Sequence, residues 1–116
     1  MSDNWPAELD ALIAAPEHHR LALDNEHVRV FETRIEPGQT VPLHTHEHPA
    51  AYYFLSWSDF IRRDENDTVT LDSKALGLTM EPGQSTWAAP IGPHTLENVG
   101  DQPLHLISVE VKVPTG

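Results

Sequence analysis

The sequence contains no cysteine, and that absence removes several chemistries at once. Disulfide frameworks, cysteine-ligated zinc sites, CxxC redox motifs and thiol nucleophiles all require a residue that the chain lacks. Long hydrophobic runs are missing too, since the longest, at 50–55, is far shorter than the roughly 18 residues of a membrane-spanning helix. The acidic start, MSDNWPAELD, lacks the apolar stretch of a signal peptide. We therefore expect a soluble, cytoplasmic protein.

Positive charge is also scarce. The chain carries 7 Lys and Arg residues against 18 Asp and Glu residues, a formal net charge of −11 with neutral histidines. A field of that sign repels phosphate backbones and anionic lipid head groups. The charge balance therefore argues against nucleic-acid and membrane partners and leaves a small molecule as the expected ligand or substrate.

What remains is an ordinary globular composition in 116 residues, with 39% hydrophobic residues and 10 prolines. That length suits one domain with many turns. Residues 1–18 predict a short helical segment, because Asn4 can cap a helix, Leu9, Leu12 and Ile13 recur on one face, and Pro16 ends the run. We expect this segment to precede a single barrel domain over residues 19–116.

The rest of the chain predicts short strands separated by turn residues. The turns are the segments DNEH, EPGQ, DEND, a second EPGQ and GDQP, all rich in residues that reverse the backbone. The expected strands are 19–23, 28–35, 40–46, 51–57, 68–71, 76–80, 85–89, 94–99 and 104–111. About nine strands at this spacing are typical of an all-β sandwich or small barrel.

One turn occurs twice. The sequence Glu-Pro-Gly-Gln stands at 36–39 and again at 81–84, and each copy is followed by a segment that leads to histidine. Pro-Gly is common turn chemistry, so the identity could be coincidental. Because both copies lead to histidine, we interpret them as equivalent turns in two halves of one barrel.

Three histidines, His44, His46 and His48, occupy alternate positions. On a strand, His44 and His46 point to the same face, roughly 6.5–7 Å apart along the chain, so both imidazoles can bind one metal ion. His48 has the same parity but stands beside Pro49, where we expect the strand to end. The alternative is that this histidine pair is only polar surface.

These histidines lie in two segments that together resemble the motifs of the cupin family. Gly38, five intervening residues and His44-Thr45-His46 resemble the first motif, and Pro90-Ile91-Gly92-Pro93-His94 followed three residues later by Asn98 resembles the second. With the flanking strands, the resemblance covers about 28–111. It implies a double-stranded β-helix, or jelly-roll barrel, with a metal bound by His44, His46 and His94, and an Asn98 that supports the barrel.

The resemblance is incomplete at one ligand. The family's glutamate falls on Ala50 or Ala51, which cannot bind a metal, and Glu47 has the opposite strand parity to His46. Three histidines remain, with His48 as a candidate fourth ligand, and this neutral set resembles that of the three-histidine cupin dioxygenases. The metal is expected to be a divalent transition ion such as Fe, Mn, Ni or Zn, and the ligands do not select among these.

Aromatic residues near the motifs are candidates for the pocket wall. We expect Tyr53 to face the interior together with Ala51, and Trp87 to precede the second motif on its strand. Both could instead simply fill the core. His105 shares strand parity with Ile107 and is expected to face inward as a core histidine.

The remaining charged candidates are expected at the surface. His18, His19 and His27 lie before, in or between the first strands. Arg34 could enter the barrel and hold a substrate carboxylate, but the arginines are expected to be solvated. These are Arg29, Arg34, Arg62 and Arg63.

Two function classes remain open. One is a metal-dependent enzyme, an oxygenase or isomerase, that acts on a small organic anion, although no second catalytic group is identifiable. The other is a non-catalytic module that binds or senses a small molecule. Strand 51–57 is apolar on both faces, and Val41 and Leu43 are expected opposite the histidine face. Because a barrel needs only one apolar face, the other must be covered by the second sheet layer, by the N-terminal helix or by another subunit, and we expect a homodimer.

Overall fold

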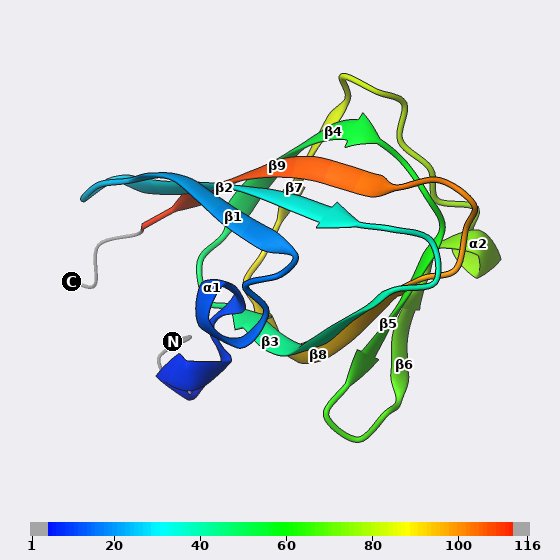
Figure 1. The fold of residues 1–116 in the computed structure, drawn as a ribbon, viewed down its shortest axis with the longest axis horizontal. Coiled ribbons are helices and arrows are strands. Elements are labelled where there is room, and N and C mark those ends of the chain that lie inside the picture. Colours follow the sequence, from blue (N-terminus) through cyan, green and yellow to red (C-terminus); the bar gives the residue numbers. More distant parts are fainter. Residues whose placement is uncertain (1–4, 113–116) are drawn as a thin grey trace.

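The fold consists of two stacked antiparallel sheets with a short helical segment at one end (Figure 1). It is seen in a computed structural model that describes residues 5–112. The helical elements are η2 (Ala7–Leu9), α1 (Ala11–Ala14) and α2 (Ser73–Leu76). The strands are β1 (His19–Asp24), β2 (Val28–Ile35), β3 (Thr40–His46), β4 (Ala50–Ser56), β5 (Phe60–Asp64), β6 (Val69–Asp72), β7 (Ser85–Ala88), β8 (Ile91–Asn98) and β9 (Leu104–Val111). The prediction of an all-β fold is confirmed.

The strands form a five-stranded sheet in the order β1-β2-β9-β4-β7 and a four-stranded sheet in the order β3-β8-β5-β6. Strand β9 is central in the first sheet, where all eight of its residues pair with β2. In the second sheet β8 is central and pairs with β3 and β5. Both central strands come late in the chain, so each sheet joins segments that are distant in sequence.

The hydrophobic core lies between the two sheets. Each strand sends alternate side chains inward, as the burial of every second residue of β9 illustrates. The buried cluster comprises Ala15, Ile35, Val41, Phe54, Phe60, Leu104 and Leu106. Such a core holds the strands of both sheets at a fixed spacing and so positions any polar side chain that points inward.

The two EPGQ turns are structurally equivalent. Gln39 and Gln84 each accept a bond from the first residue of their own turn, Glu36 N–H at 2.9 Å and Glu81 N–H at 2.7 Å. Gly38 and Gly83 both adopt positive φ, 84° and 91°, a conformation that glycine adopts without strain. The first turn leads into β3 and the second into β7 and β8, as the interpretation of two matching halves predicts.

Asn98 fixes the end of β8 by satisfying four polar groups around it. Its Oδ1 accepts bonds from the Ser58 hydroxyl at 2.7 Å and from the Gly100 N–H at 3.0 Å. Its Nδ2 donates to the carbonyls of Ile35 and Gln102, each at 2.9 Å. The side chain is buried and far from any open surface, and the expected supporting role of this residue is consistent with these contacts.

Two predicted elements differ from the structure, and one strand was missed. The N-terminal helix is split into η2 and α1, and its expected cap, Asn4, lies outside the described residues. Residues 76–80 do not form a strand, because Asp72 caps α2 and Gly77 ends that helix in the left-handed conformation. Strand β5 was not predicted, since its sequence, FIRRD, carries too much charge to indicate a strand.

The N-terminal segment packs against the barrel through Asp10. This residue forms an isolated parallel bridge with Thr45 of β3, and its carboxylate binds the Arg29 guanidinium of β2 at 2.6 Å. The segment thereby connects β3 of one sheet with β2 of the other. None of the helices described in the structure is long and apolar enough to cross a membrane.

Candidate metal centre

Histidines from both motifs meet inside the barrel. His44 of β3 and His94 of β8 are direct cross-strand partners, and their ring centroids lie 4.2 Å apart. The ring of His46 lies 4.9 Å from that of His44 and 5.3 Å from that of His94. All three side chains are buried. The two motifs therefore bring their histidines together, as the resemblance implies.

A fourth imidazole joins them from the opposite sheet. His19, the first residue of β1, is buried, and its ring lies 5.2 Å from that of His44 and 5.8 Å from that of His46. One ring nitrogen from each of His19, His44 and His46 lies within 4.8 Å of the others, a group that could hold a metal ion. The expectation of a surface position for His19 is wrong. All other residues of β1 are exposed, including Leu21 and Leu23, which share the strand parity of His19, so the apolar residues of this strand do not mark a buried face.

Backbone carbonyls fix the orientation of three rings. The Nδ1 atoms of His44 and His94 lie 2.7 Å from the carbonyls of Pro42 and Gly92, each two residues earlier. His19 Nδ1 lies 2.9 Å from the carbonyl of Ala15. A carbonyl only accepts, so each Nδ1 carries the proton and each Nε2 keeps a free lone pair. This is the state of a histidine ready to bind a metal through Nε2.

Burial keeps the histidines neutral. It lowers the pKa of His19 and of His46 to about 4 and that of His94 to about 3, with smaller contributions from neighbouring positive charges. The pKa of His44 is lowered furthest, because burial acts together with repulsion from His94 and His46. Neutral imidazoles are the form that coordinates metals, so no proton has to leave before an ion binds.

A buried carboxylate lies behind His46. Glu110 of β9 is fully buried and pairs across the sheet with Ala50 of β4, one of the two positions where the family glutamate was expected. Its Oε2 lies 3.4 Å from His46 Nδ1, and both atoms lack a hydrogen-bond partner in the described chain. A small rotation of either side chain closes this bond, which would direct His46 Nε2 toward the other imidazoles.

Arg29 compensates the charge of this carboxylate. Its Nε donates to Glu110 Oε1 at 3.0 Å, and its two terminal nitrogens donate to Asp10 at 2.6 and 3.0 Å. Burial raises the pKa of Glu110, and the guanidinium opposes that rise. The expectation of a solvated Arg29 is wrong, and no motif in the sequence marks this network, because Glu110 follows an apolar alternation without a motif of its own.

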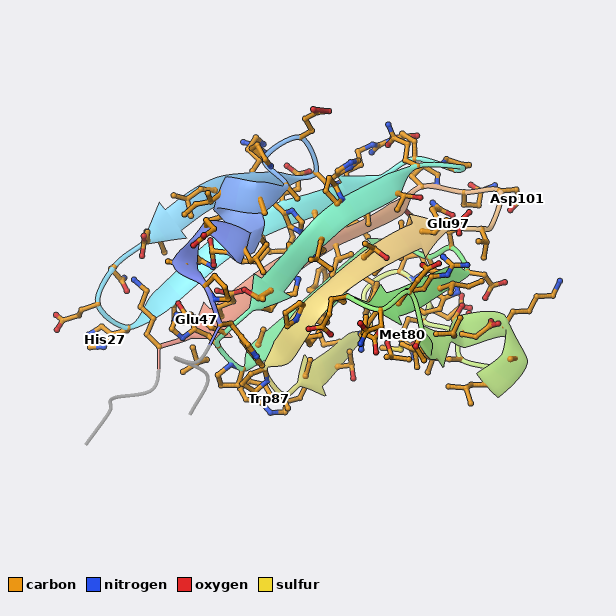
Figure 2. All side chains as sticks on the ribbon, turned by 90° about the horizontal axis from the view of Figure 1, so that it is seen from below. His27, Glu47, Met80, Trp87, Glu97 and Asp101 are labelled. Carbon is orange, nitrogen blue, oxygen red and sulfur yellow. The ribbon has the colours of Figure 1, made fainter. Side chains whose placement is uncertain are left out.

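His48 lies outside the three-histidine group. It lies two residues after the end of β3 and is half-buried. Its Nε2 lies 3.7 Å from the carboxylate of the neighbouring Glu47. Figure 2 shows Glu47 projecting from the outside of the barrel. Nothing in these contacts ties His48 to the buried imidazoles.

Both aromatic residues expected in the pocket lie elsewhere. Tyr53 is 46% exposed and Trp87 is 61% exposed, and Figure 2 shows Trp87 at the outer edge of the molecule. The reason is the phase of β4, whose inward residues are Ala50, Tyr52 and Phe54. Tyr52 therefore takes the position predicted for Tyr53, and burial raises its pKa to about 12.

Two other side chains also lie on the opposite face of their strand from the one predicted. His105 faces outward, because the even-numbered residues of β9 fill the core, and its Nε2 lies 2.5 Å from the carboxylate of Glu32. Val41 lies inside with His44, not opposite it, because the pairing of β3 with β8 shifts between these two residues. A register shift of this kind moves side chains to the other face of a sheet.

The histidines border a small internal cavity of about 80 Å³. Its other walls are mostly apolar, and the polar side chains among them are Thr33, Tyr52, Arg62 and Ser108. Ligand pockets for drug-sized molecules measure roughly 300–1,000 Å³, so this cavity suits an ion and a ligand of a few non-hydrogen atoms.

Comparison of the fold with solved structures gives consistent matches. A cupin domain from Bordetella pertussis is 21% identical, with a TM-score of 0.65 over 82% of this chain and 92% of that one. The chain has the cupin fold. An uncharacterized double-stranded β-helix protein from Klebsiella pneumoniae has a TM-score of 0.56 at 21% identity, over 100% of this chain and 90% of that one.

An RmlC-like cupin from Methanocaldococcus jannaschii also has a TM-score of 0.56, at 12% identity, over 80% of this chain and 77% of that one. No protein-family profile matches the sequence, and no curated protein matches it either. At these identities the cupin fold is shared, while ligands and reactions have to be argued from the residues of this barrel.

Proposed function

We propose that this cupin barrel binds one divalent transition metal on its buried imidazoles and acts on a small organic anion beside it. The observation that carries the proposal is the convergence of neutral histidines, with nitrogens of His19, His44 and His46 within 4.8 Å of one another. Imidazole suits ions such as Fe, Mn, Ni and Zn. The unpaired Nδ1 of His46 facing Glu110 is a further sign that these residues fit a metal, because a carboxylate behind a histidine is a common support for its ligation.

Two overlapping ligand sets are available. The cupin motifs imply His44, His46 and His94, whereas the grouped nitrogens belong to His19, His44 and His46. Both sets share two histidines, and His94 lies against His44. A site with all four imidazoles contains both sets, with His48 left outside.

The chemistry follows from the neutral donors. If bound to imidazoles alone, a divalent ion would keep its full charge and would supply Lewis acidity toward an anionic substrate, and a redox-active ion such as Fe would also supply electrons to dioxygen. The walls of the cavity are mostly apolar, and the Tyr52 phenol, whose pKa burial raises to about 12, offers an O–H donor. The residues thus favour a dioxygenase-like or isomerase-like reaction on a compact anion.

Metal content tests the proposal. Protein purified without a histidine tag and loaded with Co(II) should retain about one equivalent after gel filtration, measured by elemental analysis, with ligand-field absorption bands in the visible spectrum. His44→Ala should abolish retention. His27→Ala is the matched control, because the side chain of His27 is 78% exposed. If wild type and His44→Ala retained equally little metal, the proposal would be wrong.

The same measurement separates the ligand sets. Loss of metal in His94→Ala but not in His19→Ala identifies the set implied by the motifs. The opposite pattern identifies the set with His19, and loss in both variants identifies a four-imidazole site.

A second candidate function is a non-catalytic module that binds or senses a small molecule. The observation that favours it is the absence of Asp and Glu among the described residues that line the cavity, so no carboxylate is positioned as a general base there. Oxygen uptake by Fe(II)-loaded protein, tested with small diketones, thiols and carboxylates, distinguishes the two. Uptake that vanishes in His44→Ala supports the enzyme, whereas ligand-induced thermal stabilisation without uptake supports the binding module.

A further inference from the structure

Arg62 is an inward-facing arginine with a donor that has no partner among residues 5–112. It lies on β5, two residues after the buried Phe60, and lines the histidine cavity. Its Nε is buried and has no hydrogen-bond partner in the part of the chain that the structure describes. Leaving a buried donor unsatisfied destabilises the folded state, and more so when the group is charged. A bound ligand that accepts a hydrogen bond from Arg62 would offset this cost.

The other arginines show how unusual this is. Within residues 5–112 each of them forms an ion pair with at least one carboxylate. These pairs are Arg20–Glu32, Arg29–Asp10, Arg29–Glu110, Arg34–Glu36 and Arg63–Glu97. The chain has 18 acidic residues for 7 basic ones. With carboxylates in such excess, an unpaired guanidinium does not result from a shortage of partners.

The guanidinium lies in the field of the candidate metal centre. Its positive charge contributes to the lowered pKa of His46 and of His94, and it interacts with the Tyr52 phenol. Arg62, His94 and Ile91 line both the internal cavity and a groove on the outside of the barrel. Arg62 therefore stands between the outer groove and the histidines.

We propose that Arg62 binds the carboxylate of a small monocarboxylic acid and holds it beside the histidine cluster. This inference rests on the proposed function and specifies its substrate class. A guanidinium presents paired N–H donors that match both oxygens of a carboxylate. The apolar wall contributed by Phe54, Leu96 and Leu104 then contacts the hydrocarbon part of the ligand.

Size and charge argue for one carboxylate on a short chain. The cavity of about 80 Å³ excludes large acids, and Arg62 is the one cationic side chain, apart from the histidines, among the described residues that line it. Asp64 and Glu65 line the outer groove and oppose the approach of ligands with several negative charges. A single anionic group with a compact apolar remainder fits these constraints.

The experiment compares propanoate with propanamide, a neutral molecule of nearly the same shape. Binding is followed by calorimetry and by the Nε–H resonance of Arg62, on metal-free and on Co(II)-loaded protein. We expect propanoate to bind wild type and to shift that resonance, with propanamide weaker by about tenfold or more. Arg62→Met should lose propanoate affinity by a similar factor, whereas Arg63→Met, which changes an outward neighbour paired with Glu97, should keep it.

Stability provides a second readout. If Arg62 serves a ligand, Arg62→Met should fold and melt at the same or a higher temperature than wild type without ligand, because it removes a buried donor that has no partner within the described chain. Failure of wild type to bind propanoate, equal affinity for propanamide, or unchanged affinity in Arg62→Met would overturn the inference. Metal retention by the same variant is scored separately. Loss of propanoate binding with metal retained therefore implicates Arg62 alone, and absence of metal from wild type counts only against the proposed function.

Discussion

Replacing Arg29 by methionine should lower the free energy of unfolding by about 3–5 kcal/mol. The side chain of Arg29 is 13% exposed and connects two carboxylates, Glu110 and Asp10, whose side chains are 1% and 12% exposed. Methionine fills a similar volume but leaves both carboxylates buried without a cation. Breaking a buried ion pair in this way typically costs about 3–5 kcal/mol, mainly through the charge that remains.

The control is the same substitution at Arg20. Arg20 also binds a carboxylate across two strands, Glu32, but its side chain is 76% exposed. Solvent-exposed pairs contribute roughly 0–1 kcal/mol, so Arg20→Met should be almost neutral. Urea unfolding followed by circular dichroism measures both variants. Domains of this size have about 5–15 kcal/mol of stability, so Arg29→Met should remain folded in water.

The pH dependence adds a check on the cause. Without Arg29, the already raised pKa of Glu110 should rise further. A protonated carboxyl is neutral, so the difference in stability between wild type and Arg29→Met should narrow as the pH falls toward 5. The reasoning is wrong if Arg29→Met and Arg20→Met lower the free energy of unfolding equally, or if Arg29→Met lowers it by less than about 1 kcal/mol. Either result would show that Arg29 does not stabilise the fold by neutralising buried carboxylates.

Three further predictions concern protonation, turns and assembly. The pKa values of His19 and His46, about 4 when folded against 6.5 in the unfolded chain, mean that unfolding takes up protons between these values. The unfolding free energy of metal-free protein should therefore fall by roughly 1 kcal/mol per pH unit for each imidazole as the pH drops from 6.5 to 4, and pH-independent stability in that window would contradict the burial of these rings. Gly38→Ala and Gly83→Ala should each cost about 1–2 kcal/mol, because both need positive φ while a Cβ meets no atom closer than 3.7 Å; thermal melting of the two variants and their double should give additive losses, and a cost at one turn only would refute their equivalence. We also expect a homodimer through the exposed outer face of β4, so light scattering should give twice the monomer mass for wild type and a lower mass for Tyr53→Asp, and a monomer at every concentration would exclude it.

Much of the barrel could be predicted from local signals. Strands β2, β3 and β9 begin and end at the predicted residues, because turn segments bound each of them. The repeated turn predicted the matching halves. His44 and His94 are in contact as expected, since their motifs fix both positions relative to these turns.

The remaining features depend on register or on long-range contacts. A strand with apolar residues on both faces, such as β4, does not reveal which set faces inward, so Tyr53 was expected where Tyr52 lies. His19 reaches the cluster from β1 of the other sheet, a long-range contact for which its sequence carries no motif. Arg62 stands in a short charged strand, where an inward position cannot be distinguished from a solvated one.

The central position of β9 has a consequence for the nascent chain. Strands β2 and β4 both take their hydrogen-bond partners from β9, so the larger sheet cannot be completed before residues 104–111 have left the ribosome. Until then the chain presents two unpaired strand edges, which are sites for chaperone binding or for aggregation. Glu110 belongs to the same strand, so its ion pair with Arg29 also forms only after this strand has been synthesised. Completion of the larger sheet and formation of this ion pair are therefore one late event during synthesis.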